Sequence, residues 1–215
     1  MNRRDFCTRA LVAGTGISAL GIQGEASAQG APVEGTHYVK LSQALPTPPG
    51  KIEVIEFFWY GCPHCNAFEP ALEAWQKKLP ADVAFRRVPV AFRDEPFTAH
   101  QKIYYALEAM GLIPTMHRKV FYAIHVDRLR MDKPADIATW MGKNGVDSAK
   151  FLENYNSFTT ATKTKQASKL TADYKIDGVP ALGVAGKYFT SGTLAGTAEG
   201  SLVVADYLIQ RERKA

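Results

Sequence analysis

The chain has 215 residues, of which 46% are hydrophobic and 22% are charged. This composition is typical of a water-soluble globular protein and excludes intrinsic disorder and collagen-like fibres. The formal charge of +5 comes from residues scattered along the chain, so the charge pattern does not indicate nucleic-acid binding. The longest weakly charged stretch, 10–24, is shorter than the roughly 20 apolar residues of a membrane-spanning helix. An integral membrane protein is therefore not expected.

Residues 1–28 have the three parts of a cleavable signal peptide. Arginines near the start are followed by a modest apolar stretch, 10–22, and by the small-residue cleavage pattern at 26–28. The segment has no lipobox that runs into a cysteine, which argues against a lipoprotein anchor. We therefore expect this segment to be removed on export, with Gln29 as the first mature residue.

The same segment bears on the export route and on the cysteines. Arg3-Arg4 resembles a twin-arginine motif, but Cys7 departs from the usual pattern, so the twin-arginine and general secretory routes both stay open. Cleavage would delete Cys7 and leave one pair, Cys62 and Cys65. An exported chain with one pair is expected in an oxidising compartment, where the pair forms a stable disulfide or a redox centre.

Residues 29–94 predict a β-α-β unit. The run 51–60 is apolar, β-branched and aromatic, which is typical of a central strand covered on both faces. Pro63 suits the first turn of a following helix, whose apolar side chains recur at helical spacing. Residues 83–90 predict the second strand of the unit.

Residues 95–174 predict a helical insertion, because apolar residues there follow helical spacing and strand signals are few. Pro134 is the expected start of one helix, Asp147 the cap of the next, and Ser157 the start of another.

Residues 175–215 predict a β-β-α unit. Two strands are expected at 179–185 and 187–190 around a tight turn, followed by a helix that includes Leu202 and Leu208. The predicted architecture is therefore a β-α-β half, a helical insertion and a β-β-α half.

The cysteine pair lies in the sequence Cys62-Pro63-His64-Cys65. Cys62 would lie at the N-terminus of the predicted helix, where free backbone N–H groups and the helix dipole stabilise a thiolate. His64 adds a donor or a cation beside the sulfur, so we expect a lowered pKa for Cys62. Cys65, one turn inward, is the expected buried partner that resolves a mixed disulfide.

Two other interpretations of the pair are possible. An inert structural disulfide is disfavoured, because a bridge that closes so short a loop constrains the unfolded chain little. A zinc site would need two further ligands. The other histidines form no second pair at finger-like spacing, and they are His37, His100, His117 and His125. We therefore expect no metal.

Glu56 interrupts an apolar strand, where burial of a carboxylate is costly. In one account it is a buried acid that takes and returns the proton of Cys65, with its own pKa raised by desolvation. In the other account it pairs with a base such as Arg87 on the neighbouring strand. Glu69 and Arg87 are candidates to extend a network around it.

The chain resembles the DsbA family of thioredoxin-fold thiol:disulfide oxidoreductases over nearly the whole mature sequence. The apolar strand 54–58, the Cys-Pro-His-Cys motif at 62–65 and the segment 177–181 carry the resemblance, together with the acidic residue six positions before the first cysteine. The resemblance implies an α/β thioredoxin fold with an inserted helical subdomain. An acidic active-site thiol and an oxidising disulfide are known properties of this family.

The resemblance also implies roles for particular residues. Those expected in catalysis are Cys62, Pro63, His64, Cys65 and Glu56. The resemblance implies that the Val179–Pro180 bond is cis and faces the active-site disulfide, although only about 5–6% of X-Pro bonds are cis in general. Val179 would then offer its backbone to an extended substrate segment.

The function implied is that of a periplasmic thiol:disulfide interchange protein, which oxidises cysteine pairs in exported folding proteins. Its redox group would be the Cys62–Cys65 disulfide, with no other cofactor. A DsbB-type membrane quinone reductase would reoxidise it. We expect a monomer that binds no nucleic acid.

Two alternative functions remain. A disulfide isomerase or reductase of the same fold would be kept reduced. This alternative is disfavoured, because the short stretch between Gln29 and the first predicted strand does not hold an N-terminal dimerisation domain. A non-catalytic binding or chaperone module would keep its activity after Cys62→Ser.

Overall fold

The computed structural model describes residues 30–214, so the predicted signal peptide, 1–28, lies outside the described residues. Within the described range, no helix is long and apolar enough to cross a membrane.

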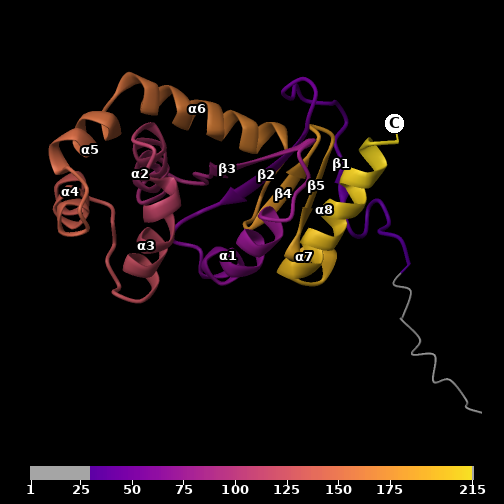
Figure 1. Ribbon diagram of the computed structural model, residues 1–215, viewed down its shortest axis with the longest axis horizontal. Coiled ribbons are helices and arrows are strands. Elements are labelled where there is room, and N and C mark those ends of the chain that lie inside the picture. Colours follow the sequence, from indigo (N-terminus) through magenta and orange to yellow (C-terminus); the bar gives the residue numbers. More distant parts are fainter. Residues whose placement is uncertain (1–29, 215) are drawn as a thin grey trace, which may run out of the picture. The chain divides into compact units, whose positions relative to one another are not determined.

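A five-stranded mixed sheet forms the centre of the fold (Figure 1). Its strands are β1 (Val39–Lys40), β2 (Ile52–Phe58), β3 (Val83–Pro89), β4 (Ala181–Val184) and β5 (Tyr188–Ser191), in the order β1-β5-β4-β2-β3. Only β2 and β3 are parallel, and they are joined through helix α1 (Pro63–Gln76). Strand β2 is therefore central, as its continuous apolar run predicts.

Five helices lie between β3 and β4 in the chain. They are α2 (Phe97–Ala109), α3 (Ile113–His125), α4 (Pro134–Lys143), α5 (Ser148–Tyr155) and α6 (Phe158–Asp173). The start signals predicted for the last three are confirmed. Pro134 lies in the first turn of α4, and the side chains of Asp147 and Ser157 cap α5 and α6.

The chain ends with α7 (Gly192–Ala195) and α8 (Ala198–Glu212). Two elements were not predicted, the two-residue strand β1 and the single turn α7, because neither is long enough to show hydrophobic periodicity. The prediction of a strand from residue 179 was also wrong, since β4 begins at Ala181. Pro180 has no N–H group to donate to a sheet, which leaves it in the preceding loop.

Both faces of the sheet are covered. Val54 and Leu182 pack with Leu72 of α1 and Leu208 of α8 on one face. On the other face, Ile55 and Phe57 pack with Ala167 of α6 and with Tyr174, which follows it. Figure 1 shows α2 to α5 gathered beyond one end of the sheet and α6 running back towards it.

Candidate active site

The turn from β2 into α1 delivers Cys62 to the start of a helix. The N–H group of Cys62 donates to the carbonyl of Trp59 at 2.9 Å. Gly61 packs against the indole ring of Trp59, where a Cβ atom would come within 2.3 Å of the ring, so the tight turn requires glycine. Pro63 follows in the first turn of α1, and Cys62 is therefore the N-cap of the helix.

The sulfur of Cys62 is held in an environment that favours the thiolate. It accepts a hydrogen bond from the backbone N–H of Cys65 at 3.3 Å. A hydrogen bond from the Cys65 side chain is the largest effect that lowers the pKa of Cys62 to about 6, followed by the N–H groups and the charge of His64, while burial opposes them. The predicted helix-terminus effect is present, and the Cys65 thiol adds a larger one.

The two thiols have opposite properties. Cys65 is completely buried, and burial raises its pKa well above the ordinary value. Its hydrogen bond to Cys62 and the charges of Cys62 and Glu56 raise the pKa further. At neutral pH, Cys62 therefore carries most of the thiolate of the pair, and the thiolate is the reactive form of a cysteine.

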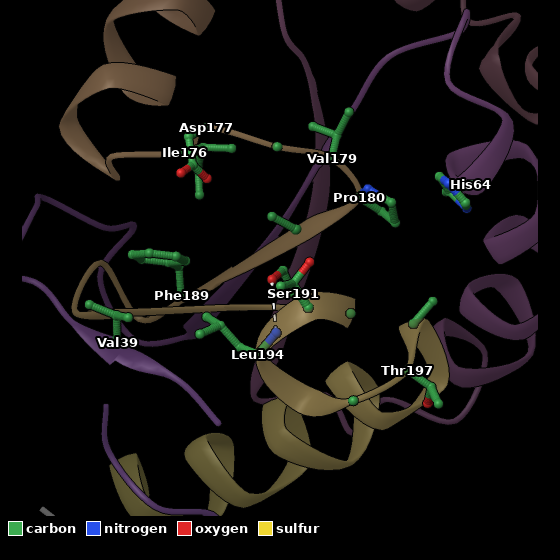
Figure 2. A pocket seen from close by; sticks show the side chains of 16 residues that line it. Val39, His64, Ile176, Asp177, Val179, Pro180, Phe189, Ser191, Leu194 and Thr197 are labelled. Carbon is green, nitrogen blue, oxygen red and sulfur yellow. Dashed lines mark hydrogen bonds between the residues drawn. The ribbon is translucent and has the colours of Figure 1, made fainter. Parts of the chain in front are cut away.

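A groove of about 730 Å³ opens beside His64 and Val179. Figure 2 shows His64, Val179 and Pro180 at one end of it, with Phe189 and Leu194 along its walls. His64 is exposed at this end, whereas Val179 and Pro180 are half-buried, and Pro63 in the first turn of α1 is also exposed.

The loop before β4 brings Val179 to Cys62. The Cys62 thiol donates to the carbonyl of Val179 at 3.4 Å, and these residues are 117 positions apart in the chain. The Val179–Pro180 peptide bond is cis, as the resemblance implies.

Glu56 lies on β2 with no exposed surface, and its register partner on β3 is Arg87. Its Oε2 atom accepts a hydrogen bond from Arg87 Nε at 2.8 Å, whereas Oε1 has no partner. Burial is the main cause that raises the pKa of Glu56 to about 8, with a further increase from the charge of Glu69 and a decrease from Arg87. The two sequence-based accounts of Glu56 are therefore compatible, since an acid that pairs with Arg87 also keeps a raised pKa.

Glu69 of α1 continues the network beyond Arg87. Its Oε2 accepts from Arg87 Nη2 at 3.0 Å, and its Oε1 is 3.0 Å from His117 Nε2. Burial alone would raise the pKa of Glu69, but the hydrogen bond from His117 and the charge of Arg87 outweigh burial and lower it. His117 Nδ1 lies 2.8 Å from the hydroxyl of Tyr60.

Sequence reasoning named Glu69 and Arg87 as candidates for this network but missed His117 and Tyr60. Neither residue belongs to a local motif, and His117 reaches Glu69 from 48 positions away. Among residues 30–214, no group of three or more histidine, cysteine or acidic side chains could hold a metal ion.

Comparison with known proteins gives the same family from sequence and from structure. The DSBA-like thioredoxin domain family matches residues 53–199. The chain is 44% identical over 213 residues to the thiol:disulfide interchange protein DsbA of Azotobacter vinelandii, which covers 99% of each chain. The chain belongs to the DsbA family. The crystal structure of DsbA from Pseudomonas aeruginosa is similar, with a TM-score of 0.82 and 44% identity over 85% of this chain and 95% of that one.

DsbA from Xylella fastidiosa is also similar in structure, with a TM-score of 0.81 and 31% identity over 86% of this chain and 100% of that one. These similarities confirm the predicted α/β thioredoxin fold with inserted helices. As a DsbA-family protein, the chain is a dithiol:disulfide oxidoreductase that acts in thiol:disulfide interchange. Its cysteine motif, Glu56 and the Val179–Pro180 loop all lie within the matched range 53–199.

Proposed function

We propose that this protein is an oxidase that donates a Cys62–Cys65 disulfide to cysteine pairs of exported proteins. The unequal environment of the two sulfurs is the observation that carries the proposal. The reduced form gains from the stabilised Cys62 thiolate, and a stable reduced form makes a disulfide a strong oxidant. A pair with two ordinary thiols would give no such preference.

In the proposed reaction, a substrate thiolate attacks the Cys62 sulfur and breaks the bond to Cys65. Cys65 leaves with the electron pair, and because its pKa is high, it takes up a proton as it leaves. The second substrate thiolate then attacks the substrate sulfur of the mixed disulfide and releases Cys62 as a thiolate. Two electrons pass from the substrate dithiol to the protein, and the substrate gains one disulfide.

Glu56 is the proposed source of the proton for Cys65. With a pKa of about 8 it is mostly protonated at neutral pH, and in its ionised form it raises the pKa of Cys65. The proton would return to Glu56 when Cys65 acts as the attacking thiol during reoxidation.

The groove beside His64 and Val179 supports binding of an extended polypeptide. The backbone of Val179 lies next to the sulfur, and Phe189 and Leu194 provide apolar walls. Main-chain hydrogen bonds to the loop would hold a substrate segment without reading its sequence. Such binding suits an enzyme that acts on many folding proteins.

We further propose a periplasmic location, with 1–28 removed on export, and reoxidation by a DsbB-type membrane quinone reductase. In this proposal 29–94 and 175–215 form the two halves of the thioredoxin fold, and 95–174 form the helical insertion. The five consecutive helices α2 to α6 support the last division. The redox group is the cysteine pair itself, without a cofactor.

Oxidation of a reduced dithiol peptide tests the proposal. One equivalent of oxidised protein should form one peptide disulfide, whereas Cys62→Ser and Cys65→Ser, which cannot form the Cys62–Cys65 disulfide, should be inactive. Equilibration with glutathione should give a potential above about −180 mV, in the range of oxidases. A potential near −270 mV, where thioredoxin-type reductants lie, would contradict the proposal. Undiminished activity of Cys62→Ser would favour a non-catalytic module.

A further inference from the structure

His117 is a buried polar side chain that has no role in the exchange reaction as described. It projects from α3 with 4% of its surface exposed. The rings of Phe58, Tyr104 and Phe121 pack around it, with centroids 5.1 to 6.0 Å away. Both of its ring nitrogens nevertheless have a polar partner, one in Tyr60 and one in Glu69.

The direction of these hydrogen bonds follows from their chemistry. An ionised Glu69 can only accept, so His117 Nε2 must carry the hydrogen that lies between them. The neutral ring then accepts at Nδ1, and the Tyr60 hydroxyl donates to it. Tyr60 thus selects the tautomer of His117 that donates to Glu69.

The two buried carboxyl groups are consequently unequal. Both oxygens of Glu69 have a donor, His117 for Oε1 and Arg87 for Oε2. Glu56 shares the same Arg87 but has a donor for only one oxygen. Because donors stabilise the charged form of an acid, the negative charge belongs on Glu69 and the proton belongs on Glu56.

We propose that His117 is a positioning residue that keeps Glu69 charged and thereby reserves the exchangeable proton of the pair for Glu56. Holding the proton on Glu56 matters for the reaction only if Glu56 exchanges it with Cys65, so this inference rests on the proposed function. Glu56 acts directly on Cys65, because its negative charge raises the pKa of the Cys65 thiol. A proton held on Glu69 would therefore be misplaced for the exchange.

His117 itself stays neutral over the working pH range. Burial is the main effect that lowers its pKa, and it outweighs the hydrogen bond and charge of Glu69. The ionisable groups that face it are Tyr60 after β2, Glu69 and Glu73 of α1, Arg87 of β3 and Tyr104 of α2. Arg118, the next residue on α3, also acts on Glu69. His117 therefore works as a fixed donor and does not titrate as a switch.

The test is the titration of the two carboxyl groups by carbon-13 NMR of reduced protein labelled in its glutamate side chains. Glu56→Gln and Glu69→Gln assign the signals. In the parent protein, Glu56 should titrate near pH 8 and Glu69 should stay ionised. His117→Leu removes the donor and should raise the pKa of Glu69 by about 1 to 2 units, with a matching loss of protonation at Glu56.

His117→Gln is the matched control, because its amide can donate to Glu69 while its oxygen accepts from Tyr60. In His117→Gln, Glu56 and Glu69 should titrate as in the parent protein. If His117 only filled space in the core, the hydrogen-bonding amide would not be needed for this result. Tyr60→Phe removes only the hydroxyl and should raise the pKa of Glu69 by a smaller amount. This second variant keeps the test decisive if His117→Leu folds poorly.

An unchanged order of titration in His117→Leu, or in Tyr60→Phe if the first variant does not fold, would overturn the inference. The role of Glu56 in catalysis is tested separately by the exchange rate of Glu56→Gln. That role can fail while the titrations still decide what His117 does.

Discussion

Replacing Glu56 with glutamine should slow peptide oxidation by about tenfold or more and stabilise the fold at neutral pH. The rate falls because glutamine cannot give a proton to Cys65, and general acid–base catalysis typically contributes at least about 100-fold. Stopped-flow oxidation of a dithiol peptide between pH 6 and 9 measures the loss. Equal rates for the variant and the parent protein over this range would show that Glu56 has only a structural role.

The stability gain follows from the raised pKa of Glu56, about 8 in the fold against 4.5 for an ordinary glutamate. Between these values the unfolded chain loses a proton that the folded chain retains, so the fold is disfavoured increasingly from pH 4.5 to 8. After allowance for the poorer hydrogen bonding of a buried amide, we expect glutamine to stabilise the fold by about 1 to 2 kcal/mol at pH 7. The gain should disappear at pH 4, where both states are protonated. Denaturant unfolding of the oxidised proteins at both pH values measures it.

Glu53→Gln is the matched control. Glu53 is also a buried acid of β2, but it pairs with Arg86 and has no part in the network under α1. This variant should be less stable than the parent protein, because it loses a charge-assisted hydrogen-bond pair, and its peptide oxidation rate should be unchanged. A rate loss equal to that of Glu56→Gln would mean that any buried charge on β2 affects the reaction.

The reduced protein should gain stability relative to the oxidised protein as the pH rises from about 6 to 9. The pKa of Cys62 is about 6 in the fold against an ordinary value of 9.0, and the disulfide form has no such titration. In this window the unfolded chain binds one more proton than the reduced fold, so the difference in unfolding free energy should change by up to about 1.4 kcal/mol per pH unit. Solvent screening reduces the total gain but not its direction.

The loop-closure effect of the disulfide opposes this gain and does not depend on pH. For a bridge that closes only four residues, the chain-entropy relation gives about 2 kcal/mol in favour of the oxidised form. We therefore expect the reduced form to become the more stable one above about pH 7.5. Denaturant unfolding of both redox forms at pH 6, 7 and 8 measures the change. A difference that does not vary with pH would contradict a thiolate at Cys62.

Much of the fold could be predicted because its signals are local. The apolar run of β2, Pro134 at the start of α4 and the caps Asp147 and Ser157 each specify their own segment. The position of Cys62 at a helix start was predictable for the same reason. Strand β1 was not, because its two residues form a strand only through pairing with β5.

The supporting network was only partly predictable. Glu56 and Arg87 could be connected because each lies at a comparable place on one of two neighbouring strands. The contacts of His117 in α3 reach Tyr60 in the turn after β2 and Glu69 in α1, which are 57 and 48 positions away in the chain. Such contacts depend on how the helices pack, and a single sequence carries no pattern for them.

The central claim is that the Cys62–Cys65 pair serves as a disulfide donor. Its most direct test is the redox state of the pair in living cells, trapped by acid quenching and then alkylation with a reagent that adds mass to free thiols. The proposed oxidase should be recovered mostly in the oxidised form, without added mass. Recovery mostly with both cysteines alkylated would contradict the account and indicate an isomerase or a reductase.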